Sequence, residues 1–138
     1  MRSVLLHTNV LAELVRQRPE PRVVDFVRSQ PNALISVLTL HELAYRAARV
    51  EHAARRAALE GWLARIRGQF AGSVVDVDTA IAERAGRVRA EADRRARRAD
   101  VVDVLIAATA LERGALVATR NVRDFEPLGV DVIDPWSS

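Results

Sequence analysis

The chain has 138 residues with a formal net charge of +3 at pH 7, and it contains 21 arginines, no lysine and no cysteine. The absence of cysteine excludes disulfides, thiolate metal sites and cysteine nucleophiles. The absence of lysine excludes a P-loop lysine and a Schiff base, and neither a G-x-G-x-x-G motif nor a G-x-S-x-G elbow occurs. The chemistry that remains open is that of carboxylates with a divalent metal ion.

Length and hydrophobicity predict one soluble domain that spans residues 1–138. Hydrophobic residues make up 49% of the chain and aromatic residues only 4%, so the core is expected to consist of Leu, Val, Ile and Ala. No stretch approaches the roughly 20 apolar residues of a membrane span, and the chain opens with a strand rather than a signal sequence. We therefore expect a cytoplasmic protein with no membrane contact. Arginine side chains suit phosphate recognition, but a GC-rich coding bias is the favoured explanation for the absence of lysine.

The first half of the chain alternates between short apolar runs and helical patterns. Pro19 and Pro21 interrupt it after the first helix, and Leu59, Leu63 and Ile66 recur at helical spacing further on. The predicted elements are a strand at 4–6, helices at 10–15 and 22–29, a strand at 33–37, and helices at 39–50 and 51–70.

The second half continues the alternation. A strand is predicted at 74–77, with Asp78 as the cap of the helix that follows, and a last edge strand at 131–133. Between them lie a buried helix from Asp100, a strand at 115–119 and the start of another helix. Strands that alternate with helices through short connections indicate an α/β fold with a parallel sheet covered on both faces.

The stretch from Asp100 to Phe125 contains the most informative helix. No charged residue occurs between Val104 and Leu111, and a helix that is apolar all round is expected to be buried. Asp103 lies at the head of this helix, and a carboxylate that enters a packed core needs a partner or a metal ion. Gly114 is expected to end the helix in the left-handed conformation.

Four positions are expected to meet at the carboxyl edge of the sheet, where open α/β sheets bind ligands. Position 7 follows the first strand, Glu42 opens the helix after the second, Asp103 opens the buried helix, and Asp124 follows the strand at 115–119. For any one acid, helix capping is the commoner explanation, because T-x-x-E at 39–42, D-x-x-D at 100–103 and N-x-x-D at 121–124 all look like capping motifs. Capping does not require all the acids to share one edge, whereas a site for Mg²⁺ or Mn²⁺ does. Such an ion can activate water for attack on a phosphodiester.

Four stretches carry a resemblance to a known family: LLHTNVLAEL at 5–14, ISVLTLHEL at 35–43, VVDVLIAATALERGALVATRNVRDFEPLGV at 101–130 and DPW at 134–136. In these stretches the chain resembles PIN-domain ribonucleases of the VapC toxin type, close to the FitB-like branch. The resemblance implies a three-layer α/β/α domain whose central parallel sheet has four to five short strands. It also implies a metal-dependent endoribonuclease that uses Mg²⁺ (or Mn²⁺) on an RNA substrate, a homodimer, and inhibition by a VapB-type antitoxin.

The same resemblance assigns roles to individual residues. Catalytic and metal-binding roles fall on Glu42, Asp103, Asp124 and position 7, where this chain has His7. Supporting roles around these ligands fall on Asn9, Thr119 and Asn121.

The family has aspartate at position 7, so His7 is the main departure from the pattern. Three interpretations remain open: an inactivating substitution, a natural variant with altered metal preference, or a histidine that merely packs at a strand end. The alternative to a nuclease is a degenerate, non-catalytic PIN domain that binds antitoxin or RNA. Asp100 stands where relatives often have proline, and we expect it to be a helix N-cap. The run Arg94–Arg98 could contact RNA phosphates, but a solvated loop or an antitoxin contact explains it equally well.

Overall fold

Five short parallel strands form the centre of the computed structural model, which describes residues 2–137. Strand β1 (Val4–Leu6) lies in the middle, between β2 (Ala33–Ser36) and β4 (Leu116–Ala118). Strands β3 (Val74–Val75) and β5 (Val132–Ile133) form the two edges. In the order β3-β2-β1-β4-β5 the chain first extends the sheet on one side of β1 and then on the other. The order in which strands are added therefore reverses between β1 and β4, although all the strands are parallel.

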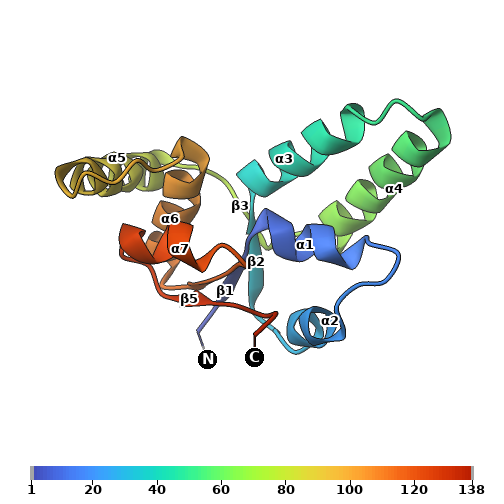
Figure 1. Ribbon diagram of the computed structural model, residues 1–138, viewed down its shortest axis with the longest axis horizontal. Coiled ribbons are helices and arrows are strands. Elements are labelled where there is room, and N and C mark those ends of the chain that lie inside the picture. The colour runs from blue at the N-terminus through green and yellow to red at the C-terminus, as the bar shows by residue number, and fades with distance from the viewer. Residues whose placement is uncertain (1, 138) are drawn as a thin grey trace.

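The helices cover both faces of this sheet (Figure 1). One face packs against helices from the first half of the chain and the other against helices from the second half. The first group comprises α1 (Thr8–Leu14), α2 (Pro21–Arg28), α3 (Val37–Ala48) and α4 (Ala53–Gln69). The second comprises α5 (Thr79–Arg94), α6 (Val101–Arg113), α7 (Val122–Phe125) and the 3-10 turn η1 (Glu126–Leu128).

Side chains of the central strand alternate between these two layers. Val4 and Leu6 are buried with the first group of helices, whereas Leu5 is buried with the second. This is the period of two that a strand imposes, and it gives the sheet two separate apolar cores. The predicted three-layer α/β/α fold with a parallel sheet is confirmed.

Helix α6 has the buried character that its sequence predicts, with every residue from Ile106 to Ala110 buried. It begins with the Asp100 carboxylate accepting hydrogen bonds from the backbone N–H groups of Val102 (2.8 Å) and Asp103 (3.2 Å). It ends at Gly114 with a φ of 61°, the left-handed conformation that glycine adopts at little cost. The predicted N-cap and C-terminal glycine are both confirmed.

The start of α3 differs from the prediction. Ser36 is the N-cap and accepts a hydrogen bond from the N–H of Leu38 at 3.0 Å, so the helix begins at Val37 rather than at Thr39. The predicted T-x-x-E capping box is therefore wrong: Thr39 already lies inside the helix, where its hydroxyl accepts a hydrogen bond from that of Thr8. Glu42 consequently lies in the second turn of α3 and does not open it.

Other boundaries shift by one or two residues. The predicted strands at 74–77 and 115–119 shorten to β3 and β4, and the helix predicted at 51–70 begins at Ala53, with His52 as its N-cap. Asp78 caps α5 as predicted, accepting from the N–H of Ile81 at 2.9 Å. Within residues 2–137, no helix is long and apolar enough to cross a membrane.

Candidate active site

The candidate site lies at the carboxyl ends of β1 and β4, where the strand order reverses and where open parallel sheets bind ligands. His7 directly follows β1, and Thr119 directly follows β4. The N–H of His7 donates to the carbonyl of Ala118 at 2.9 Å, which holds the two strand ends together. Asp103 approaches this point from the first turn of α6.

The ring of His7 is buried and held by three neighbours. Its Nδ1 lies 2.9 Å from Oγ1 of Thr119, and its Nε2 lies 3.8 Å from Oδ1 of Asp103. The ring of Phe125 packs edge-on against it, with 4.9 Å between the ring centroids. Phe125 is fully buried, and His7 has the contacts of a packed side chain.

The hydrogen bonds around Thr119 define the tautomer of His7. Oγ1 of Thr119 accepts from the side-chain amide of Asn9 (3.2 Å) and from the backbone N–H of Asn121 (3.0 Å). A hydroxyl oxygen has two lone pairs, so these two donors leave the Thr119 O–H to donate to Nδ1 of His7. The neutral ring therefore carries its proton on Nε2, and that N–H faces Asp103.

The acids around Asp103 lie close enough to repel one another. The pKa of Asp103 is raised from 3.8 to about 6, first because the carboxyl is partly buried and then because Asp100, Asp124 and Glu42 are negatively charged. The resemblance places three of these four acids in the metal site. Their mutual repulsion is what a bound cation would relieve.

The pKa of His7 is lowered, mainly by burial. The charges of Glu42 and Asp124 oppose this shift, whereas that of Arg46 adds to it. The ring is therefore neutral at pH 7, and the 3.8 Å approach to Asp103 joins a neutral ring to a carboxyl group rather than forming an ion pair. A neutral ring does not offset the negative charge of the acids.

The structure brings some of the predicted ligands into contact and leaves others at a distance. Glu42 is held by an ion pair with Arg46, 3.7 Å away on the next turn of α3, and Asp124 lies exposed on α7. Among the described residues, no three His, Asp or Glu side chains lie close enough together to hold a metal ion. The donor chemistry fits a hard cation, because Asp103, Glu42 and Asp124 offer oxygen ligands, but the ligands do not form a closed shell. Arg46 was not predicted, although its spacing of four residues from Glu42 is an ordinary helical pair.

Helix capping accounts for only one of the acids at this edge. Asp100 is an N-cap, but within residues 2–137 no backbone N–H donates to the carboxylates of Glu42, Asp103 or Asp124. Asn121 does not cap α7 with its side chain either. The capping interpretation of N-x-x-D at 121–124 is therefore wrong. Helix capping does not explain the presence of Glu42, Asp103 or Asp124 at this edge.

Comparison with known proteins agrees with this geometry. A parallel sheet with helices on both faces defines the class of open-sheet α/β proteins, in which ligands bind where the strand order reverses. The PIN domain profile matches residues 4–129, and the chain belongs to this family.

Three relatives place the chain in the VapC and FitB branch of the family. The tRNA(fMet)-specific endonuclease VapC of Shigella flexneri is 33% identical over 138 residues, which cover 99% of this chain and 100% of that protein. Toxin FitB of Neisseria gonorrhoeae is 31% identical, covering 96% and 98%, and the crystal structure of FitAcB from that organism matches with a TM-score of 0.92 at 30% identity, covering 98% of this chain and 99% of that chain. The DNA-bound VapBC structure from Salmonella typhimurium matches with a TM-score of 0.80 at 32% identity, covering 98% and 99%.

Proposed function

We propose that this protein is a VapC-type endoribonuclease toxin whose activity depends on a divalent metal ion and is impaired by His7. The observation that carries the proposal is Asp103, a partly buried carboxyl at the reversal point of a PIN sheet. Its pKa is raised by burial and by the surrounding acids. The Shigella relative, which matches along its whole length, is an endonuclease.

Asp103, Glu42 and Asp124 would hold Mg²⁺, or Mn²⁺ as a second choice, through their carboxylate oxygens. Their side chains would have to move closer together around the ion than they lie in this structure. When bound, such an ion would activate water and stabilise the charge that develops on the RNA phosphate. Binding requires Asp103 to lose its proton, which occurs above a pH of about 6. Thr119 has a supporting role, because it holds Asn9, Asn121 and the residue at position 7 in one hydrogen-bonded group.

His7 impairs this site for two reasons. It contributes no negative charge, and its Nε2 presents an N–H rather than a lone pair to the space beside Asp103. A histidine that coordinated the ion through Nε2 would need the opposite tautomer, and the two hydrogen bonds that Thr119 accepts oppose that change. A natural variant with a preference for Mn²⁺ or Zn²⁺ is a less favoured proposal.

The burial of His7 also favours a second candidate function, a non-catalytic PIN domain that binds antitoxin or RNA. Both candidates require partner surfaces. We propose a VapB-type antitoxin, since FitB and VapC relatives were solved as FitAcB and VapBC. We also propose a homodimer, because Tyr45 of α3 and Val101 and Val102 of α6 are exposed large hydrophobic side chains. A cytoplasmic location is part of the same proposal.

The test compares cleavage of a transfer RNA mixture by the wild-type chain and by His7→Asp, with Mg²⁺ and with Mn²⁺. Restoring the carboxylate should produce cleavage that EDTA abolishes, and adding Asp103→Asn to His7→Asp should remove it again. Absence of cleavage by His7→Asp with either ion would support the non-catalytic candidate. Equal cleavage in Mg²⁺ by both chains would show that His7 does not impair the site.

A further inference from the structure

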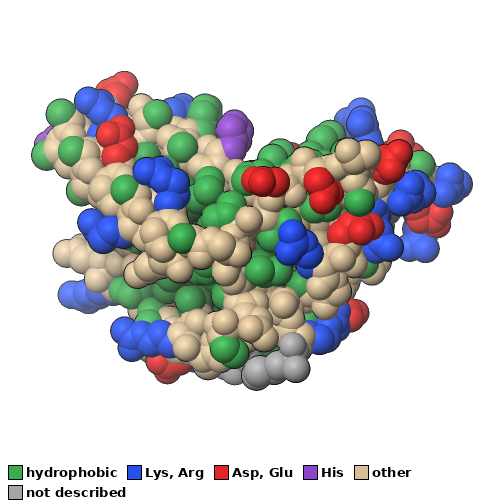
Figure 2. Space-filling model, turned by 180° about the vertical axis from the view of Figure 1, so that it is seen from behind, with side chains coloured by type: hydrophobic (Ala, Val, Ile, Leu, Met, Phe, Trp, Pro, Cys, Tyr) green, Lys and Arg blue, Asp and Glu red, His purple; other side chains and the backbone are tan. Residues whose placement is uncertain are grey.

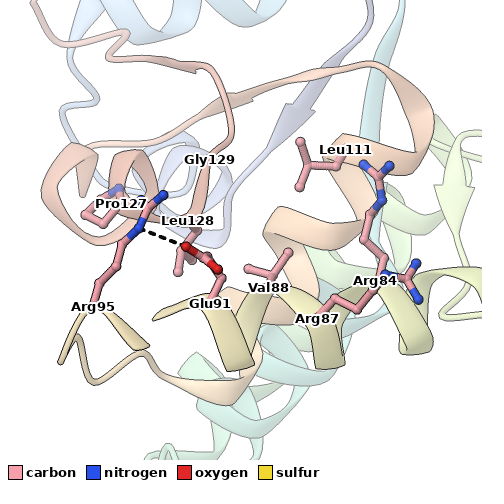
Figure 3. A pocket seen from close by; sticks show the side chains of 9 residues that line it. All are labelled: Arg84, Arg87, Val88, Glu91, Arg95, Leu111, Pro127, Leu128 and Gly129. Carbon is pink, nitrogen blue, oxygen red and sulfur yellow. Dashed lines mark ion pairs between the residues drawn. The ribbon is translucent and has the colours of Figure 1, made fainter. Parts of the chain in front are cut away.

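Three adjoining hollows follow the C-terminal half of α5 along the side of α7 and η1. The first, of about 300 Å³, lies between α5, α6 and η1, with Val88, Leu111 and Leu128 among its apolar lining (Figure 3). The second, of about 520 Å³, shares Arg95 and Pro127 with the first. The third, of about 490 Å³, shares Arg97 with the second. Neighbouring hollows share lining residues, so together they form a row along this side of the molecule.

We call this surface the α5–α7 furrow and define it by its arginines: Arg84, Arg87, Arg95, Arg97, Arg98 and Arg123.

Four of these arginines have no carboxylate partner in the described part of the chain. Arg84 pairs with Glu112 at 2.8 Å and Arg95 with Glu91 at 3.2 Å, whereas Arg87, Arg97, Arg98 and Arg123 are in no ion pair within residues 2–137. These four side chains are exposed. Figure 2 shows Arg side chains gathered at the free end of α5, with a few acids among them. Guanidinium groups without carboxylate partners can bind phosphate oxygens through paired hydrogen bonds.

The furrow begins at the segments that carry two of the site acids. Arg123 immediately precedes Asp124 on α7. The loop with Arg97 and Arg98 leads directly to Asp100, the N-cap of the helix whose first turn carries Asp103. An RNA strand bound at these acids would therefore lie beside segments that also carry arginines of the furrow.

A second arginine-lined groove lies on the other side of the sheet and serves as a comparison. Its volume is about 710 Å³, and its arginines include Arg18, Arg55 and Arg65, which lie on α4 and on the loop after α1. Neither segment carries a site acid. We call this surface the α1–α4 groove.

We propose that the α5–α7 furrow binds the phosphates of an RNA strand that extends away from the candidate active site. The inference rests on the proposed function, since it names the surface that would hold the substrate of that same site. No aromatic side chain lines the furrow, so base stacking has no platform there. Binding would therefore depend on phosphate charge and would be independent of sequence.

The test measures binding of a labelled single-stranded oligouridylate to the full chain by fluorescence anisotropy, in EDTA and at several salt concentrations. The variant combines Arg97→Gln, Arg98→Gln and Arg123→Gln, all at exposed positions. Each phosphate contact with a single strand contributes about 0.7 to the slope of log K against log salt. Loss of three contacts should reduce the magnitude of that slope by about 2. Lysine at the same three positions should restore most of it, which a purely structural role would not predict.

The matched control removes the same number of charges from the α1–α4 groove through Arg18→Gln, Arg55→Gln and Arg65→Gln. This control should leave the slope unchanged. The proposal is overturned if the furrow variant keeps the wild-type slope, or if the control lowers it as much. Because binding is measured without metal, its loss in the furrow variant would support the furrow even if His7→Asp cleaves no RNA. Cleavage by His7→Asp with an unaltered slope in the furrow variant would leave the proposed function standing and remove this inference.

Discussion

Replacing His7 by aspartate should convert a chain that Mg²⁺ does not stabilise into one that it does. The ring is neutral, the side chain of His7 is 10% exposed, and its Nε2 lies 3.8 Å from the carboxylate of Asp103. The substitution adds a negative charge beside a group whose pKa is already raised to about 6. It also removes the edge-on contact with Phe125.

The magnitude follows from the separation of the charges. Aspartate is shorter than histidine, so the two carboxylates would lie about 5 Å apart. At an effective dielectric constant of about 20, the repulsion is about 3 kcal/mol. Without a divalent ion, the variant should therefore keep a proton on one of the two carboxyls or lose about that much stability. With Mg²⁺ at about a hundredfold excess over its Kd, binding should contribute about 2.7 kcal/mol, or about 10 °C in Tm for a chain of this size.

Calorimetry at about pH 8, with EDTA or with Mg²⁺, measures the increase in Tm that Mg²⁺ produces. His7→Asn is the matched control, because it removes the ring without adding a charge and should gain no stability from Mg²⁺. An equal Mg²⁺ shift in the wild-type chain would refute the account of His7. If Mg²⁺ does not raise the Tm of His7→Asp, the proposal that these acids form a metal site is refuted.

Three further predictions concern the site with His7 in place. Asp103 has a higher pKa in the folded chain than its ordinary value of 3.8, so it binds its proton more tightly when folded and its contribution to stability falls as the pH rises from about 4 to about 6. Urea unfolding in EDTA should therefore show Asp103→Asn to be more stable than wild type by about 1–3 kcal/mol above that pH window, and equally stable below it. The lowered pKa of His7 changes stability with pH in the opposite direction. Because both chains contain His7, comparing them at each pH largely cancels its contribution. Nitrogen NMR at neutral pH should find the His7 proton on Nε2, and a proton on Nδ1 would contradict the hydrogen-bond assignment at Thr119. Asp100→Ala should cost about 1 kcal/mol through loss of the N-cap. It should also lower the pKa of Asp103 in a carboxyl NMR titration, because Asp100 is the nearby charge that raises that pKa most. An unchanged pKa would contradict a contribution from Asp100 and leave burial, Asp124 and Glu42 as its causes.

The sequence by itself determined the features that depend on local physical chemistry. An uncharged run predicted that α6 is buried, and Asp78, Asp100 and Gly114 were correctly assigned to helix ends, because a cap is made by neighbours in the chain. Alternating strands and helices predicted the parallel three-layer fold. The start of α3 was wrong because Ser36 and Thr39 are both capable N-caps, and the sequence does not show which one the backbone uses.

Only the tertiary structure decided how the site residues meet. His7 and Thr119 are 112 positions apart, and their hydrogen bond exists because β1 and β4 are neighbours in the sheet. The tautomer of His7 depends on donors from Asn9 and Asn121, which no local pattern in the chain encodes. The raised pKa of Asp103 depends partly on Asp100, three residues earlier in the chain, but its largest cause is burial, and the charges of Asp124 and Glu42 come from other helices. Candidate ligands can thus be named from the sequence, but their protonation states come from contacts that form only when the sheet assembles.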